Sequence, residues 1–211
     1  MTNELRIVAA AALRDLNHAF VAHEADSALL ERIAVFARDA AAELRVTERR
    51  DLAPLLSANV GRLFRVDSAD ETAPSPANFM TDRAVGGESN PTSAEFEFGY
   101  EADEVVVRTT LGAAYEGAPG RAHGGMVAAL FDDITGFLLP LAGTPGYTGQ
   151  LSVRYVRPVP IETPLEFRTR IESRQRRKLH VTAECSARDE LVATAEALFI
   201  TVDVGRFGQS S

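Results

Sequence analysis

The stretch GAPGRAHGGMVAALFDDITGFLLP, residues 117–140, decides the fold because it joins a glycine-rich turn to a long apolar segment. Apolar side chains recur in it at the three- and four-residue spacing that predicts a buried helix over about residues 123–139. The core face of this helix comprises Met126, Val127, Leu130, Phe131, Ile134, Phe137 and Leu138. The opposite, small-residue face comprises Gly125, Ala128, Ala129, Asp132, Thr135 and Gly136. This second face lacks the charges of a solvated helix, so we expect something to approach it closely.

Two features of this segment are candidates for chemistry. Asp132 lies about 170° from the centre of the core stripe, whereas Asp133 lies at the edge of the stripe, where a surface or boundary residue is expected. Gly124 and Gly125, at the first helical positions, are expected to leave backbone N–H groups unpaired in the positive potential of the helix dipole. A developing oxyanion could bind there. The alternatives are a solvated aspartate and ordinary turn chemistry.

The spacing of the motif resembles that of a known family. His-Gly-Gly with an aspartate nine residues after the histidine, in a long apolar helix, resembles the hotdog-fold acyl-CoA thioesterases of the phenylacetate-pathway and THEM type. The stretch YTGQLSVRYVRPVP, residues 147–160, is similar to the strand that follows the central helix in that family. The resemblance covers about residues 95–203. It implies an α+β hotdog fold, in which an antiparallel sheet wraps around a long central helix.

The resemblance also implies a site shared by two subunits, with the oxyanion turn from one and the carboxylate from the other. The N–H of Gly124 would polarise the thioester carbonyl, and Asp132 would act as a nucleophile or as the general base that activates water. Thr148 matches a Ser or Thr that orients the water. His123 matches the motif histidine, which either contacts the substrate or only fixes the loop. Gly117 departs from relatives that carry an oxyanion-assisting Asn at this position.

A coenzyme A thioester carries phosphates, so basic residues near the surface are candidate contacts. These candidates are Arg157, in the Arg-Pro turn, and the cluster Arg174, Arg176, Arg177 and Lys178, in a predicted hairpin turn. The alternative for the cluster is a solvated turn. Gly125 and Gly117 are further candidates for substrate binding. The sequence shows no P-loop, dinucleotide fingerprint or metal-ligand cluster, so we expect no metal and no cofactor, and coenzyme A enters as part of the substrate.

The function expected from these residues is hydrolysis of an acyl-CoA thioester to a free acid and coenzyme A. A non-catalytic acyl-CoA-binding or regulatory hotdog protein is the alternative. A hotdog hydratase or dehydratase fits less well, because His123 and Asp132 lie about half a turn apart on the helix and point apart within one chain. A second copy docking over the small-residue face would leave a cleft, which predicts a homodimer or a dimer of dimers.

The composition fits a globular protein. The chain has 211 residues, of which 45% are hydrophobic, enough for one domain with a sizeable core. A net charge of −8 and a pI of about 5.1 argue against nucleic acid and membrane as partners. The early apolar run is too short for a membrane span and lacks a basic start, so a cytoplasmic protein is expected. The single cysteine, Cys185, excludes an intramolecular disulfide and is expected to be a buried thiol.

Four segments are predicted along the chain. Residues 1–50 form an N-terminal helical extension, residues 51–91 an irregular connection, residues 92–204 the hotdog domain and residues 205–211 a tail. Runs of period-two alternation in the third segment predict its antiparallel strands.

The helical extension is expected to contain two amphipathic helices, over residues 4–22 and 27–48, with Asp26 or Ser27 as the N-cap of the second. The pair is expected to pack against the main domain or across an oligomer interface. The extension is close to neutral, which argues against a DNA-binding module. His18 and His23 are off the spacing of a helical metal pair and are expected at the surface.

Overall fold

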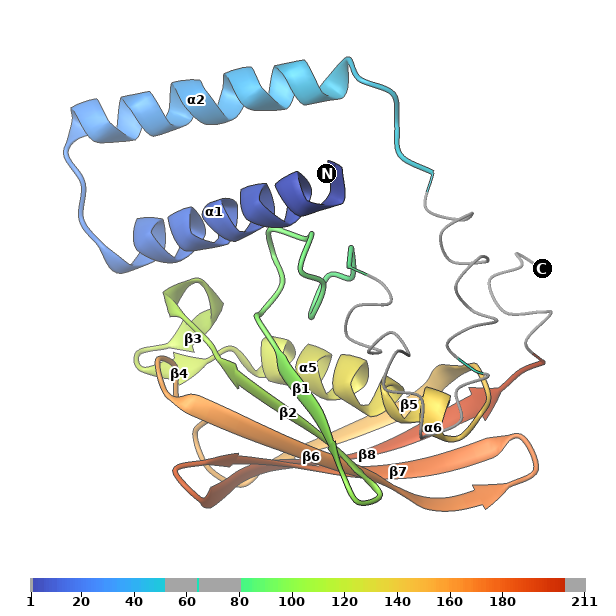
Figure 1. The fold of residues 1–211 in the computed structure, drawn as a ribbon. Helices are drawn as coiled ribbons and strands as arrows, with labels where there is room; N and C mark the ends of the chain where they lie inside the picture. Colours follow the sequence, from blue (N-terminus) through green and yellow to red (C-terminus); the bar gives the residue numbers. More distant parts are fainter. Residues whose placement is uncertain (1, 52–63, 65–80, 204–211) are drawn as a thin grey trace.

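The computed structural model describes residues 2–51, 64 and 81–203. Most of the expected connection, residues 52–63 and 65–80, lies outside the described residues, as does the tail 205–211. Figure 1 shows a curved sheet that wraps around one helix, with two further helices stacked on the same side.

The sheet has six strands within the described residues, in the order β1-β2-β6-β7-β8-β5, and every neighbouring pair is antiparallel. The strands are β1 Glu97–Glu101, β2 Glu104–Thr110, β5 Gly146–Tyr155, β6 Pro164–Gln175, β7 Lys178–Ala187 and β8 Glu190–Thr201. The predicted alternation is confirmed: Leu165, Phe167, Leu179 and Val181 are buried on the concave face. Cys185 is also buried there, and burial raises the pKa of its thiol to about 12. The predicted α+β hotdog fold is therefore confirmed.

Helix α5, Gly124–Gly136, fills the concave side, where Val127, Leu130 and Ile134 are fully buried. The single helix predicted over residues 123–139 is wrong at its C-terminal end, because α5 stops at Gly136 and a short helix α6, Leu138–Leu141, follows. Proline cannot donate to the carbonyl four residues earlier, and its ring clashes with that carbonyl. Pro140 therefore ends the α-helical ladder at Gly136.

The apolar side chains of residues 124–141 pack in the core of the domain. Gly124–Leu141 is the only stretch among the described helices that is long and apolar enough, by length and composition, to cross a membrane. In the structure its apolar side chains pack in the core cluster with those of the sheet, which accounts for a mean hydropathy of 1.4. The core of the fold is thus built around α5.

The small-residue face of α5 is narrower than the sequence predicts. Thr135, expected on that face, is fully buried, and its hydroxyl donates to the Phe131 carbonyl at 2.7 Å. Residues 81–91, the described end of the expected connection, and the residues that follow them up to Phe96 pack beside the C-terminal half of the helix. Arg83 lies over the Phe137 ring at 4.5 Å, and Phe96 meets the same ring edge to face. The described end of the connection therefore covers part of the helix.

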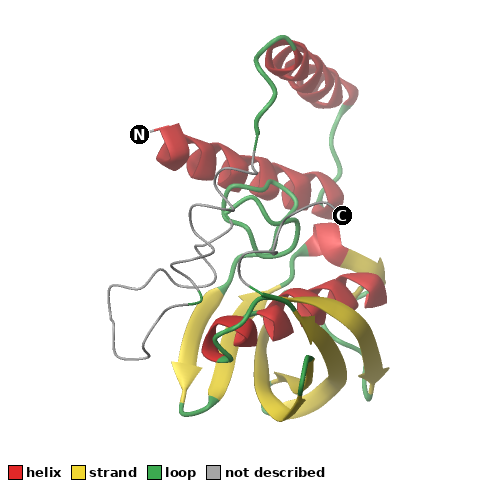
Figure 2. Cartoon of the chain, turned by 90° about the vertical axis from the view of Figure 1, so that its right-hand side faces the viewer, coloured by secondary structure: helices red, strands yellow, loops and turns green. Residues whose placement is uncertain are grey.

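The N-terminal helices are α1, Thr2–Ala22, and α2, Ser27–Arg45. The predicted cap is confirmed, because the Asp26 side chain accepts from the Leu29 N–H at 2.7 Å. Helix α2 lies on the far side of α1 from the sheet (Figure 2). No residue of α2 is buried. Packing against the main domain is thus observed for α1.

Polar side chains hold helix α1 against the main domain. Arg14 is 6% exposed and donates to the carbonyls of Glu88 and Asn90, at 3.1 and 2.9 Å, and to the Glu95 carboxylate at 3.3 Å. His18 was expected at the surface, but it is half-buried and its Nδ1 accepts from the Ala114 N–H at 3.1 Å. Its partner lies 96 residues away in the sequence.

Candidate active site

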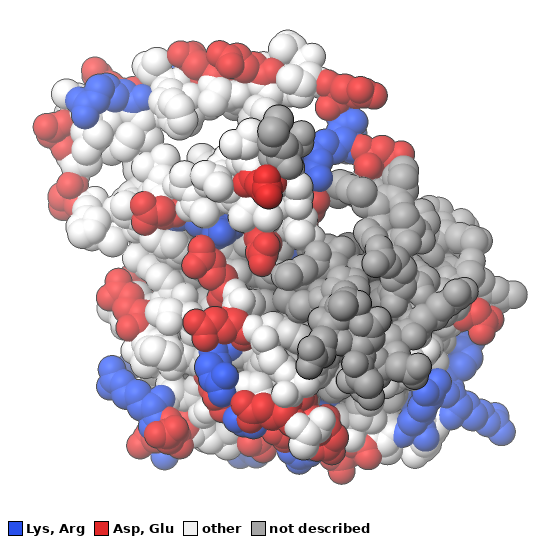
Figure 3. Space-filling model, viewed as in Figure 1, with Lys and Arg blue, Asp and Glu red and all other residues white. Residues whose placement is uncertain are grey.

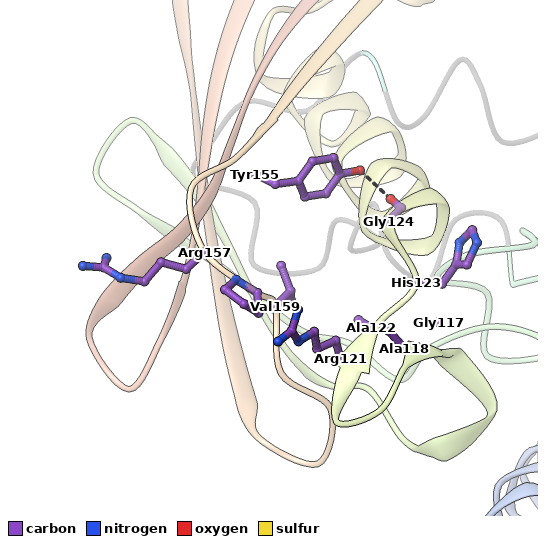
Figure 4. Close-up of a pocket in the computed structure, with 10 residues that line it drawn as sticks. Gly117, Ala118, Arg121, Ala122, His123, Gly124, Tyr155, Arg157 and Val159 are labelled. Carbon is purple, nitrogen blue, oxygen red and sulfur yellow. Dashed lines mark hydrogen bonds between the residues drawn. The ribbon is translucent and has the colours of Figure 1, made fainter.

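The turn that precedes α5 is built by short elements. The 3-10 helix η1, Ala113–Tyr115, leads into a small hairpin of β3, Glu116–Ala118, and β4, Arg121–Ala122. Beside this hairpin lies a hollow of about 290 Å³, which we call the Gly124 pocket. Its lining is Gly117, Ala118, Arg121, Ala122, His123, Gly124, Tyr155, Arg157, Pro158 and Val159 (Figure 4). Four predicted site residues therefore meet here: Gly117, His123, Gly124 and Arg157.

Hydrogen bonds fix the turn on both sides of His123. The His123 N–H donates to the Tyr115 carbonyl at 2.8 Å, and the Ala122 N–H donates to the Val159 carbonyl at 2.9 Å. His123 is also the N-cap of α5, because its Nδ1 accepts from the Gly125 N–H at 3.0 Å. The expectation that the Gly125 N–H is unpaired is therefore wrong, since the motif histidine engages it.

The Gly124 N–H is different, because it donates to no acceptor within the described residues. It belongs to the first residue of α5, where the helix dipole adds positive potential. The Gly124 carbonyl is engaged: the Tyr155 hydroxyl donates to it at 2.6 Å (Figure 4). One open backbone donor thus remains at the start of the helix, and its residue lines the pocket.

Gly117 has a packing reason to be glycine. A Cβ built on it would lie 2.7 Å from the Cα of His123, closer than carbon atoms approach each other. A side chain here, including the Asn of some relatives, requires the turn to move. In this chain the residue therefore permits the close approach of β3 to His123.

The two aspartates of α5 differ in their surroundings. Asp132 is exposed, and its carboxylate has no ion pair within the described residues. Asp133, expected at the surface or boundary, is 16% exposed and pairs with Arg83, Nε to Oδ1 at 3.6 Å. Burial raises the pKa of the Asp133 carboxyl, while Arg83 acts in the opposite direction. Asp132 is thus the aspartate that is open to a ligand or a second subunit.

The remaining predicted residues lie away from the pocket in a single chain. Asp132 follows Gly124 by eight residues, which is about 12 Å along the helix. Thr148 is exposed on β5, seven residues before Tyr155 and so about 23 Å along the strand. One chain alone does not bring Asp132 or Thr148 to the Gly124 pocket.

The basic cluster lies at the other end of the sheet. Arg174, Arg176, Arg177 and Lys178 surround the β6–β7 turn, whereas β3 and β4 lie at the opposite end (Figure 1), and basic side chains gather at that turn in Figure 3. Arg174 donates to the Ala142 carbonyl and Arg177 to the Thr201 carbonyl, each at 3.1 Å. The structure therefore separates this cluster from the pocket within one chain.

Comparison with known protein families finds a match to the segment that carries the Gly124 pocket turn and α5. Residues 119–194, which contain the pocket turn, α5 and β5–β7, match the family model described as "Thioesterase superfamily". This segment is similar to that superfamily.

Curated relatives match this chain over part of their length. The acyl-coenzyme A thioesterase THEM4 of Mus musculus is 31% identical over 114 residues, which are 51% of this chain and 49% of that protein. The acyl-coenzyme A thioesterase THEM5 of Homo sapiens is 28% identical over 86 residues, 41% of this chain and 35% of that protein. The chain thus spans about half the length of THEM4, and less of THEM5.

Solved structures extend the likeness to the N-terminal helices. A thioesterase superfamily protein of known crystal structure aligns with 92% of this chain and 94% of its own, at a TM-score of 0.72 and 25% identity. A putative thioesterase from Ralstonia eutropha, described as phenylacetic acid degradation-related, aligns with 68% of this chain and 99% of its own, at a TM-score of 0.50 and 26% identity.

Sequence reasoning missed the two other polar side chains of the Gly124 pocket, Tyr155 and Arg121. Tyr155 stands in the Tyr-x-Arg-Pro turn, and this motif was the available signal for it. Arg121 gave no signal beyond its place next to the motif. Arg157, which was predicted, donates to the Leu191 carbonyl at 3.1 Å and lies 3.7 Å from the Glu190 carboxylate. Among the described residues, no group of three or more His, Cys, Asp or Glu could hold a metal ion.

Proposed function

We propose that this chain hydrolyses acyl-CoA thioesters to a free acid and coenzyme A. The observation that carries the proposal is the Gly124 N–H, a donor without an acceptor in the described residues, at the start of α5 and beside a hollow. The names of THEM4 and THEM5 as acyl-coenzyme A thioesterases support the same substrate class. A thioester carbonyl needs such a donor when its oxygen becomes negatively charged.

In the proposed reaction, the Gly124 N–H stabilises the oxyanion and Asp132 supplies the base or the nucleophile. As a base, Asp132 accepts a proton from water while the water oxygen attacks the carbonyl carbon; the C–S bond then breaks and the thiolate takes up a proton. As a nucleophile, Asp132 forms an acyl anhydride and releases the thiol, and water then hydrolyses the anhydride. Both routes need the exposed carboxylate of Asp132.

We further propose that two copies of the chain form each site. Helix α5 runs antiparallel to β5, because Gly124 contacts Tyr155 and a Cβ built on Gly146 would lie 3.3 Å from Leu139. Strand β5 is an edge strand whose outer backbone groups can pair with another strand.

Pairing two β5 strands antiparallel about a two-fold axis would set the Gly146 end of one copy beside the Tyr155 end of the other. This arrangement would bring Asp132 and Thr148 of one copy toward Gly124 of the other. It would also bring the partner's β6–β7 turn to the pocket end, where the basic cluster could contact coenzyme A phosphates together with Arg157 of the first copy.

The hydratase alternative finds less support in the turn. A hydratase needs the histidine as an acid or base toward the substrate, but His123 Nδ1 is occupied as the helix cap. The binding-module alternative differs from the proposal only in its lack of turnover.

The experiment is release of free thiol from a panel of acyl-CoAs by wild type, Asp132→Asn and the matched control Asp103→Asn, in the β1–β2 turn. We expect Asp132→Asn to lower kcat by about 100-fold or more, and Asp103→Asn to be unchanged. Tight acyl-CoA binding without thiol release by wild type would instead support the binding module. A mixture of Asp132→Asn subunits with subunits whose turn is blocked, Gly124→Val, should regain part of the activity if the site is shared.

A further inference from the structure

The Tyr155 hydroxyl reaches from the end of β5 to the first turn of α5, where it donates to the Gly124 carbonyl at 2.6 Å (Figure 4). We propose that Tyr155 is a positioning residue, which holds Gly124 so that its free N–H points at the thioester oxygen. This inference rests on the proposed function. It assigns Tyr155 a role in the thioester reaction without contact to the reacting atoms.

Gly124 needs such an anchor because two glycines in succession begin the helix. Glycine has the greatest backbone freedom of any residue, and the first residues of a helix lack the i−4 bonds that restrain its interior. The other bonds of the turn act on its neighbours: the His123 N–H binds the Tyr115 carbonyl, and the Gly125 N–H binds the His123 side chain. Tyr155 supplies the side-chain bond to Gly124 itself.

Hydrogen bonds to the neighbouring strand hold the backbone around Tyr155. Tyr155 pairs with Ala193 of β8, and the N–H groups of Val156 and Arg157 both donate to the Val192 carbonyl, at 2.8 and 3.0 Å. The backbone that carries the phenol is therefore fixed to β8, the neighbour of β5 in the sheet. The hydrogen bond transfers that rigidity over 31 residues of sequence to the helix start.

The fit between the phenol and the turn depends on glycine. A Cβ built on Gly124 would lie 3.3 Å from the Tyr155 oxygen, so a larger residue would push the hydroxyl away. The Tyr155 side chain is also 48% exposed, so it contributes little to the core. Its defined interaction is the hydrogen bond, and its proton is committed to the Gly124 carbonyl. A role as proton donor to the substrate is therefore less consistent with this geometry.

The test is Tyr155→Phe, which removes the hydroxyl and keeps the ring, beside the matched control Tyr100→Phe on β1, outside the pocket. With an acyl-CoA that wild type hydrolyses, we expect Tyr155→Phe to lower kcat about 5- to 20-fold while KM stays within about twofold. The control should keep both constants. A raised KM with unchanged kcat would overturn the inference, because Tyr155 would then stabilise the bound substrate and the transition state equally.

A second readout does not depend on turnover. Amide hydrogen exchange at Gly125, whose N–H is bonded to His123 Nδ1, followed by NMR without substrate, should become at least fivefold faster in Tyr155→Phe and stay unchanged in Tyr100→Phe. If wild type hydrolyses none of the thioesters, the proposed function fails, yet this measurement still decides whether Tyr155 anchors the turn. Unchanged exchange at Gly125 would overturn the inference whatever the activity.

Discussion

The imidazole Nδ1 of His123 accepts a hydrogen bond from the Gly125 N–H at 3.0 Å, so the motif histidine closes one of the two glycine amides and leaves the other open. In the proposed reaction this selects Gly124 as the oxyanion donor. The histidine is therefore a helix cap in the free protein, whatever contact it makes with a substrate.

Removing this cap should weaken the fold measurably. We expect His123→Ala to lower the free energy of unfolding by about 1 kcal/mol, the usual cost of losing a side-chain N-cap. His123→Asn should recover most of the loss, because its amide oxygen can accept the same N–H. Urea denaturation of the three proteins checks this. Equal stability of His123→Ala and wild type would show that the cap contributes nothing.

A methyl group at Gly117 should disturb the pocket. The Cβ would lie 2.7 Å from the His123 Cα, a backbone atom that cannot swing away. We expect Gly117→Ala to lower the melting temperature by several degrees and, if the proposed function holds, to reduce kcat/KM. Gly99→Ala is the matched control, because a Cβ there meets no atom within 4 Å. Equal melting temperatures for the two variants would contradict the close packing.

The Asp133–Arg83 pair should make stability depend on pH. Burial raises the pKa of Asp133 above its ordinary value of 3.8, so the folded chain binds this proton more tightly than the unfolded chain. The resulting stability is present below pH 3.8 and is lost as the pH rises through the folded-state pKa. Asp133→Asn should abolish this part of the pH dependence, measured by urea unfolding between pH 3 and 7.

At neutral pH, removing the other partner of this pair should be costly. Arg83→Met leaves the buried carboxylate of Asp133 without the cation that lowers its pKa, which we expect to lower the free energy of unfolding by about 3 kcal/mol. The double variant Arg83→Met, Asp133→Leu should recover most of this loss, since apolar side chains of similar size avoid the buried charges. If the loss of stability in the double variant equals the sum of the losses in the two single variants, the two residues are not coupled.

Arg14 should control the docking of α1. Its guanidinium is 6% exposed and bonds two carbonyls and a carboxylate of residues 88–95. We expect Arg14→Met to release α1, with a loss of about 2–4 kcal/mol and faster hydrogen exchange in residues 5–20. Arg6→Met, on the exposed side of the same helix, serves as the control. Unchanged exchange in Arg14→Met would show that apolar contacts alone hold the helix.

The sequence predicted best the strands that bury one face, because their apolar and polar residues alternate. Leu165, Phe167, Leu179 and Val181 alternate with polar residues because α5 covers one face of the sheet. The end of α5 was misplaced because the apolar stripe continues past Gly136. Pro140 has no N–H to donate to the Gly136 carbonyl, so the helix ends there although the apolar pattern continues.

The site was predictable where its residues are close in sequence. His123 and Gly124 lie in one motif, and Gly117 and Arg157 flank it in the same resemblance. Arg14, His18 and Tyr155 find their partners across 31 to 96 residues of sequence, and no local pattern encodes such pairings. The places of Asp132 and Thr148 depend on a second copy in the proposed arrangement, so neither local pattern nor a single chain determines them.

Helix α2 carries three acidic and three basic residues and buries none of its side chains against the rest of the described chain. Substitutions on its outer surface therefore have little effect on the folding of the sheet and α5. This makes α2 a practical attachment point: a cysteine introduced there for a fluorescent dye would react readily, while the native Cys185 stays shielded in the core.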